Sequence, residues 1–197
     1  GTAKEAESYS CFWKPELKGK VGHFDWHLPN LGQMSLYDGN GASLWNLNGS
    51  QWSKVQETTM SLRPQIGGFF DYGGTFNGLK NGEMQAMVGI GDWITGVLEK
   101  DGAPVASVIP KEGGIQFTES YSIGKGSEKA EEAKKFIQYM MSPAGQVKSA
   151  QMLAYPGFCV TKAGRAALIE ADLEEAKRSH QIDGDAQDPI TLIKEGR

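Results

Sequence analysis

The sequence has no apolar run long enough to cross a membrane and no cluster of basic residues. A membrane helix needs about 20 consecutive apolar residues. A nucleic-acid-binding surface needs Lys and Arg gathered on one face. Here 20 basic residues are interspersed with 24 acidic ones, and the net charge is −4. The sequence therefore predicts neither a membrane-spanning helix nor a nucleic-acid partner, and its hydrophobic content of 39% is ordinary for a globular domain.

Motifs of nucleophilic, metal-dependent and nucleotide-dependent catalysis are also missing. The chain has no Gly-x-Ser-x-Gly, no His-Glu-x-x-His, no phosphate loop and no dinucleotide fingerprint. Gly89 and Gly91 lack a third glycine, and the Asp92 that follows them would repel a phosphate. We therefore expect a protein that is not an enzyme and that needs no cofactor.

Cysteine is scarce, and Cys11 and Cys159 have no metal-binding or redox spacing. The two could pair in an oxidising compartment. Two separate buried thiols are the simpler interpretation. The sequence leaves both possibilities open.

What the chain does contain is an alternation of strand-like and helical segments. Strands are expected at 20–25, 66–70, 84–90, 105–109 and 116–123. Helices are expected at 31–36, 50–63 with Ser50 as its cap, 75–80, 93–100, 128–141 and 143–153, with further helix after 163, a loop at 183–188 and a short apolar turn at 190–193. This alternation favours an α/β fold with a parallel or mixed sheet and helices on its faces.

Five short phrases, in the same order and at similar spacing, resemble the spermidine/putrescine-binding family of ABC-importer solute-binding proteins. They are Trp13 to Gly19 (WKPELKG), Asn81 to Glu83 (NGE), Pro110 to Ile115 (PKEGGI), Lys134 to Pro143 (KKFIQYMMSP) and Ala154 to Pro156 (AYP). The resemblance extends over about residues 12–160 and is loose beyond.

The resemblance implies a type II periplasmic-binding-protein fold, of which this sequence would supply lobe two and the later part of lobe one. Residues 1–107 and 165–197 would form lobe two, and 108–164 would recross the hinge and form part of lobe one. The first lobe that the family carries ahead of the Trp-Pro-Glu segment is not in this sequence, and Gly1 to Glu5 do not form a signal peptide.

The resemblance also implies a function and partners. We expect a periplasmic component of an ABC importer that binds a polyamine or another small cationic solute. Hinge closure, with backbone rotation at Gly113 and Gly114, would then present the loaded protein to a membrane permease.

Carried over position by position, the ligand contacts of the family fall on seven residues here. They are Asp25, Trp26, Asp92, Trp93, Phe117, Glu119 and Tyr155. Carboxylates neutralise ammonium groups in such a cleft, and aromatic faces pack on the methylenes. The match departs from the family at Ile90, where polyamine binders have an aromatic residue, and at Trp26, since the acid of that loop stands one place earlier.

Other interpretations compete at several of these positions. Asp92 could cap the helix that follows. Phe117 could be a core residue of its strand. His23, Asp25 and His27 would share one face of a strand that ran through them, so a transition-metal site there is the alternative function. A structural interaction module is a third possibility.

Overall fold

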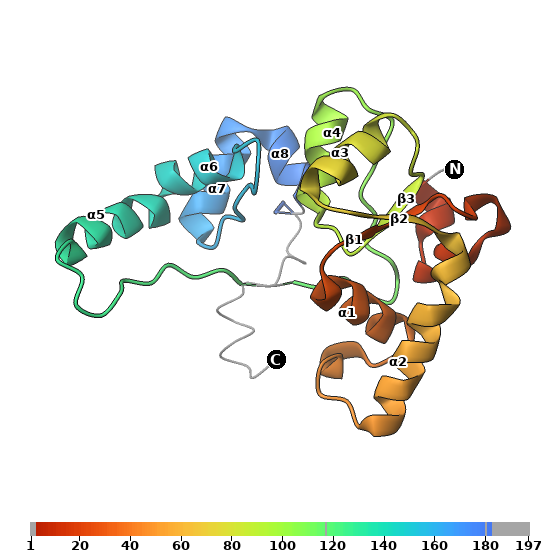
Figure 1. Cartoon of the computed structure of the whole chain (residues 1–197). Coiled ribbons are helices and arrows are strands. Elements are labelled where there is room, and N and C mark those ends of the chain that lie inside the picture. Colours follow the sequence, from red (N-terminus) through yellow and green to blue (C-terminus); the bar gives the residue numbers. More distant parts are fainter. Residues whose placement is uncertain (1–2, 117, 180, 183–197) are drawn as a thin grey trace. The chain divides into compact units, whose positions relative to one another are not determined.

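The computed structural model describes residues 3–116, 118–179 and 181–182 (Figure 1). The chain divides into two compact units, Gly1–Gln116 and Phe117–Arg197, which are described separately. Helices and strands are labelled as in Figure 1, and short 3-10 helices are labelled η.

The first unit contains a three-stranded parallel sheet with the strand order β2-β1-β3. β1 (Val21–Phe24) lies between β2 (Ile66–Phe70) and β3 (Ala86–Val88), so that His23 pairs with Phe69 on one side and with Val88 on the other. The predicted α/β class with a parallel sheet is confirmed.

Helices cover both faces of this sheet (Figure 1). α1 (His27–Tyr37) and α2 (Gly49–Ser61) lie on one face, and α3 (Tyr72–Lys80) and α4 (Asp92–Lys100) lie on the other. The short helices are η1 (Ala3–Ala6), η2 (Tyr9–Trp13), η3 (Pro15–Leu17), η4 (Gly41–Ser43) and η5 (Arg63–Gln65).

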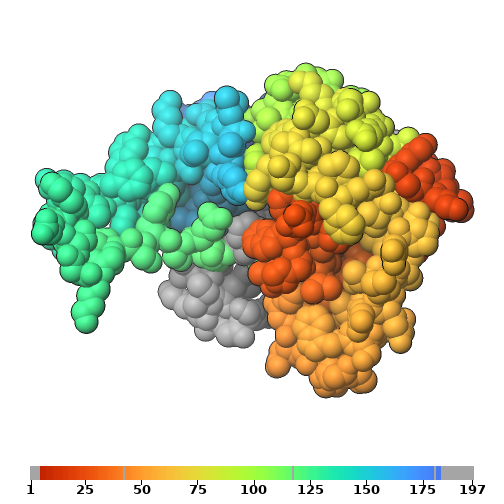
Figure 2. All heavy atoms as spheres, viewed as in Figure 1, coloured from red at the N-terminus to blue at the C-terminus, as the bar shows by residue number. Residues whose placement is uncertain are grey.

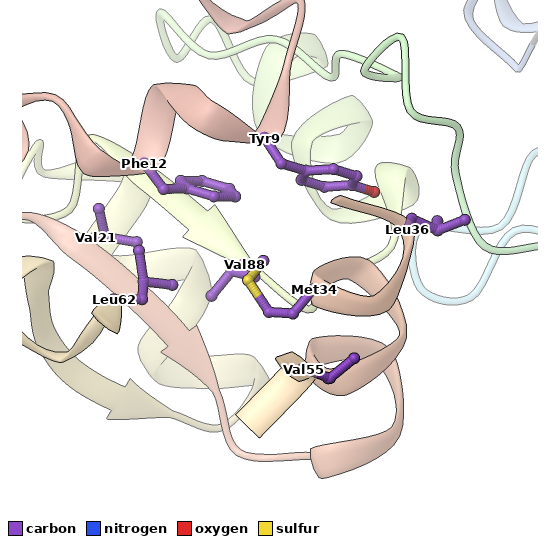
Figure 3. Packing of buried hydrophobic residues seen from close by; sticks show 8 residues of the cluster. All are labelled: Tyr9, Phe12, Val21, Met34, Leu36, Val55, Leu62 and Val88. Atoms are coloured by element: carbon purple, nitrogen blue, oxygen red, sulfur yellow. The ribbon is translucent and has the colours of Figure 1, made fainter. Parts of the chain in front are cut away.

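Each face of the sheet has its own hydrophobic core. The larger core contains Tyr9, Phe12, Val21, Met34, Leu36, Val55, Leu62 and Val88 (Figure 3). The smaller core is formed by Leu79, Ile94 and Leu98, with Met87 and Trp93 packed against them. Because side chains alternate along a strand, Met87 and Val88 enter opposite cores. This packing fixes the register of β3 and the position of the loop that follows it.

The second unit is helical in the part that the structure describes. It contains α5 (Ala130–Met141), α6 (Pro143–Ala150), α7 (Lys162–Ala171) and α8 (Leu173–Arg178). A small core of Ala150, Cys159, Leu168 and Ala176 holds the last three helices together. No residue of α5 is buried, and this helix projects from α6 and α7 (Figure 1 and Figure 2).

Two of the predicted strands do not form among the described residues. Residues 105–109 form no strand: Val105 N donates to Ala103 O, and Val105 packs against the smaller core instead of joining the sheet. Residues 118–123 likewise form no strand. An apolar, extended sequence becomes a strand only where a neighbouring strand can pair with it.

The ends of several helices also differ from the predictions. α1 begins at His27, four residues before its predicted start. Pro29 is tolerated there because it stands in the first turn, where an N–H has no partner within the helix. α2 is capped by Asn48 and not by Ser50: Asn48 Oδ1 accepts from Gln51 N at 3.0 Å, and Gln51 Oε1 accepts from Asn48 N at 3.0 Å. α6 ends at Ala150, three residues before its predicted end. The predicted loop and turn at 183–193 lie outside the described residues.

Both cysteines are free thiols, Cys11 half-buried in the first unit and Cys159 buried in the second.

Candidate functional site

The carboxyl ends of the three parallel strands lie along one edge of the sheet, and each is followed directly by polar and aromatic residues. Asp25 and Trp26 follow β1, Asp71 and Tyr72 follow β2, and Gly89 to Trp93 follow β3. Four of the predicted site residues, at positions 25, 26, 92 and 93, are therefore brought to one edge by the parallel topology.

The strand order also singles out one position along this edge, where the direction of the chain connections reverses. After β1 the chain turns to β2 on one side, and after β2 it crosses to β3 on the other side of β1. In open α/β sheets, ligands bind outside the strand carboxyl ends at such a reversal. Here the reversal lies between β1 and β3, and the Asp25–Trp26 and Asp92–Trp93 pairs stand on either side of it.

Two amides of α1 hold the loops after β1 and β3 in place. The Asn30 Nδ2 atom donates to Phe24 O at 2.8 Å and to Trp26 O at 2.5 Å. Gln33 Oε1 accepts from Gly89 N at 2.8 Å. The Asn30 side chain is buried, and its Oδ1 atom has no hydrogen-bond partner among the described residues. The same helix thus positions the loop after β1 and the loop after β3.

An aromatic cluster continues from the β1 end toward α3 and α4. The Tyr72 ring lies 4.8 Å from Phe24 and 5.8 Å from Trp93, measured between ring centroids, and Phe76 also lies 5.8 Å from Trp93. Sequence reasoning missed Tyr72 as a member of this edge. Its position directly after the strand 66–70 was the signal that could have found it.

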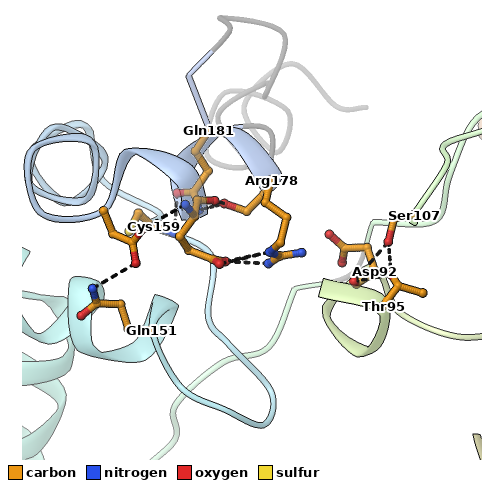
Figure 4. A network of polar contacts seen from close by, with 10 residues as sticks. Asp92, Thr95, Ser107, Gln151, Cys159, Arg178 and Gln181 are labelled. Carbon is orange, nitrogen blue, oxygen red and sulfur yellow. Dashed lines mark hydrogen bonds and ion pairs between the residues drawn. The ribbon is translucent and has the colours of Figure 1, made fainter. Parts of the chain in front are cut away.

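Asp92 does not cap α4 with its side chain, which corrects the alternative interpretation. The N-cap is Gly91, and Asp92 is the first helical residue, where its charge is favoured by the positive end of the helix dipole. Its main-chain carbonyl accepts from the Thr95 hydroxyl at 2.8 Å and from the Ser107 hydroxyl at 3.2 Å (Figure 4). These bonds fix the backbone from which the carboxylate projects.

The remaining predicted residues belong to the second unit. Phe117 lies outside the described residues, so neither its site role nor its core interpretation is tested. Glu119 is exposed, and Tyr155 is 49% exposed with a positive φ of 51°. Their role beside the first four residues stays a prediction.

Buried polar bonds support the packing of the second unit. Glu175 is 2% exposed and accepts from the Arg178 guanidinium at 2.6 Å, while Gln181 Oε1 accepts from Cys159 N at 3.0 Å (Figure 4). These bonds satisfy the polar groups that the small apolar core would otherwise leave buried and unpaired.

The metal alternative is not supported. β1 ends at Phe24, and His27 is already the first residue of α1, so the strand alternation needed to align His23, Asp25 and His27 is absent. Within residues 3–116, 118–179 and 181–182, no group of three or more His, Cys, Asp and Glu side chains could hold a metal ion. Burial lowers the pKa of His23, whose ring packs 4.9 Å from Phe69.

The segment predicted to recross the hinge is tied to the start of the chain within the first unit. Glu112 accepts from the Ser8 hydroxyl and from Tyr9 N at 3.3 Å, and the Tyr9 hydroxyl donates to Gly113 O at 3.0 Å. Lys111 N donates to Glu7 O at 2.8 Å. Burial and the nearby Glu112 charge raise the pKa of Tyr9 to about 12. Two passages of the chain thus run together here.

A parallel sheet with helices on both faces and acid–aromatic pairs at its topological reversal defines an α/β ligand-binding domain. The chain belongs to the bacterial extracellular solute-binding protein family, whose model matches residues 2–175. This membership agrees with the predicted location outside the cytoplasm. Among the residues that the structure describes, no helix is long and apolar enough to span a membrane.

The chain is also similar to individual curated proteins. The spermidine/putrescine-binding periplasmic proteins of Escherichia coli (strain K12) and of Salmonella typhimurium are each 27% identical to this chain over 160 residues. The matched region covers 78% of this chain and 43% of each relative, so the chain spans less than half the length of the curated proteins it matches. No solved structure matches the chain.

Proposed function

We propose that this chain is part of a periplasmic solute-binding component of an ABC importer, without enzymatic activity, that captures a small cationic solute. The observation that carries the proposal is the placement of the Asp25–Trp26 and Asp92–Trp93 pairs on the two sides of the β1/β3 reversal. Carboxylates and aromatic rings are the groups that an alkylammonium needs when it leaves water. The similarity to spermidine/putrescine-binding proteins supports the same chemistry.

In this proposal the fold is of the type II periplasmic-binding class. Residues 1–107 and 165–197 form lobe two, and 108–164 recross the hinge and form part of lobe one. Phe117, Glu119 and Tyr155 then complete the cleft from the other side. Solute stabilises the closed form by its greater affinity for that form, and the closed protein docks on a membrane permease.

Calorimetry on the complete two-lobe protein tests the solute class. Putrescine, spermidine, arginine and a disaccharide are titrated into the wild type and into Asp92→Asn and Glu119→Gln. Removing one partner of a desolvated ion pair costs roughly 3–5 kcal/mol, so each change should weaken binding of the cationic solute at least about 100-fold.

The matched controls are Glu99→Gln, an exposed carboxylate at the other end of α4, and Glu128→Gln, exposed ahead of α5. Both should bind like the wild type. Tight binding of the disaccharide that neither Asp92→Asn nor Glu119→Gln weakens would contradict the cationic assignment and leave the transport role in place.

A further inference from the structure

A third acid–aromatic pair, Asp71–Tyr72, stands at the carboxyl edge of the sheet beside the two pairs of the proposed site. It follows β2 directly, as Asp25–Trp26 follows β1. The Asp71 carboxylate is engaged within the helix that follows, since Asp71 Oδ1 accepts from Gly74 N at 2.8 Å and caps α3. The aromatic ring is therefore the member of this pair that we consider as a contact for solute.

The Tyr72 ring connects the β2 side of this edge with the β3 side. Its centroid lies 4.8 Å from that of Phe24, the last residue of β1, and 5.8 Å from that of Trp93, which follows β3. The Phe24 side chain is buried, whereas Tyr72 and Trp93 are half-buried. The two half-buried rings thus adjoin a buried one at the end of β1 and keep part of their own surface accessible to solvent.

The Trp93 indole lies back over the loop that follows β3. A Cβ atom on Gly91, the N-cap of α4, would lie 2.9 Å from Trp93 Cδ1 and 3.2 Å from Trp93 Nε1. The five-membered ring of the indole therefore covers the residue that ends this loop. The side chain of Asp92, between these two residues, is exposed. A charged group and an aromatic surface thus adjoin at this end of the edge.

We propose that Tyr72 is a further solute-contacting residue, and that its ring and the Trp93 ring together form the surface on which the alkyl chain of a cationic solute packs. This inference rests on the proposed function and adds to it the place of the apolar part of the solute. Aromatic faces attract alkylammonium groups, and burial of each methylene against them adds to the affinity.

Calorimetry on the complete two-lobe protein tests this role, with whichever of putrescine and spermidine binds the wild type more tightly as the probe. Tyr72→Leu stays apolar but lacks the ring, and it should bind the probe at least about fivefold more weakly. Tyr72→Phe keeps the ring, and its affinity should stay within about twofold of the wild type. Wild-type affinity in Tyr72→Leu overturns the proposal.

Phe76→Leu is the matched control for packing against the indole. Phe76 lies at the same centroid distance of 5.8 Å from Trp93 as Tyr72 does. It stands four residues further along α3, about 6 Å from Tyr72 along the helix axis. Its replacement should therefore leave the affinity for the probe near that of the wild type. Equal losses in Phe76→Leu and Tyr72→Leu would mean that both residues act only by supporting Trp93, and would overturn the proposal.

A direct signal from Tyr72 covers the case in which Tyr72→Leu does not fold. The complete protein is labelled with 3-fluorotyrosine, and the fluorine signal of Tyr72 is assigned by its loss in Tyr72→Phe. The same amine probe is then added stepwise. The Tyr72 signal should shift and saturate with the midpoint that calorimetry gives. A signal that stays in place while the probe binds overturns the proposal.

The outcomes separate this inference from the proposed function. If the wild type binds the probe and Asp92→Asn weakens that binding while Tyr72→Leu does not, the proposed function stands and the Tyr72 contact alone is overturned. If the wild type binds neither putrescine nor spermidine, this inference is overturned, and titrations with arginine and the disaccharide decide the proposed function.

Discussion

Gly89, in the loop after β3, lies directly against the Asn30 side chain of α1 at the candidate site. Its φ is +85°, a conformation that other residues adopt only with strain, and a Cβ atom there would lie 2.4 Å from Asn30 Oδ1. The displaced Asn30 amide would release the Phe24 and Trp26 carbonyls that it holds. A single methyl group at this position would thus disturb the loops after both β1 and β3.

We predict that Gly89→Ala lowers the free energy of unfolding by about 1–3 kcal/mol, as measured by urea denaturation. Gly102→Ala is the matched control, since Gly102 also has a positive φ of +81° but no heavy atom lies within 4 Å of the place that its new methyl group would take. The control should show the backbone strain alone. Equal losses in the two variants would mean that the contact with Asn30 carries no weight.

Tyr9 gives the molecule a defined response to alkali. Its pKa rises from 10.0 to about 12, first because the phenol is buried and second because Glu112 is near. The unfolded chain then loses this proton at lower pH than the folded chain does. The stability contributed by the neutral phenol is fully present below pH 10.0 and is lost as the pH rises through about 12.

Urea midpoints measured between pH 9 and pH 12 check this response. The wild type should lose stability more steeply over that range than Tyr9→Phe, which lacks the titrating group. Parallel pH profiles for the two proteins would count against a raised Tyr9 pKa. A spectroscopic titration of the six tyrosines should show one of them ionising last.

At the scale of elements, the N-terminal cap of α2 distinguishes what the sequence suggests from what the structure adopts. The sequence favoured Ser50, whereas the reciprocal bonds join Asn48 and Gln51. We predict that Asn48→Ala costs about 1 kcal/mol of stability and that Ser50→Ala costs less, since Ser50 only donates to the capping oxygen. Thermal unfolding of the two variants gives the comparison, and a larger loss in Ser50→Ala would favour Ser50 as the cap.

The elements that were predicted correctly are those specified by local sequence. Apolar periodicity and flanking glycine or proline located 66–70, 93–100 and 128–141 within two residues. The failures at 105–109 and 116–123 share one cause: strand formation depends on a partner far away in the sequence, which no local pattern encodes. The cap at Asn48 was missed because residues 48–51 are mostly polar and contain more than one side-chain oxygen that could cap the helix.

At the scale of the whole molecule, the candidate site could be predicted in part. Positions 25, 26, 92 and 93 meet at one edge because parallel strands place their carboxyl ends together, and the sequence contains that information once the strands are recognised. Tyr72 and the two amides of α1 depend on packing and were not predicted. The resemblance to a family supplied all seven candidate residues, and the roles of Glu119 and Tyr155 stay predictions.

Glu112 and Gly113, which are hydrogen-bonded to Tyr9, belong to the proposed hinge. Closure of this hinge should change the radius of gyration. Small-angle scattering of the complete two-lobe protein should show a smaller radius of gyration when the cationic solute is added. Glu112→Gln, which loosens the tie to Ser8, should alter the unliganded radius more than the liganded one. An identical radius with and without bound solute would contradict hinge closure.

The uncovered face of α5 has a practical consequence for all work with this chain by itself. Phe136 and Tyr139, three residues apart and so on one side of the helix, are 55% and 53% exposed, and no residue of the helix is buried. Neighbouring exposed apolar side chains of this kind promote colloidal attraction between molecules, and a net charge of −4 opposes it only weakly once salt screens the charge. Light scattering should therefore detect self-association that grows with concentration and with ionic strength, and Phe136→Ser should reduce it.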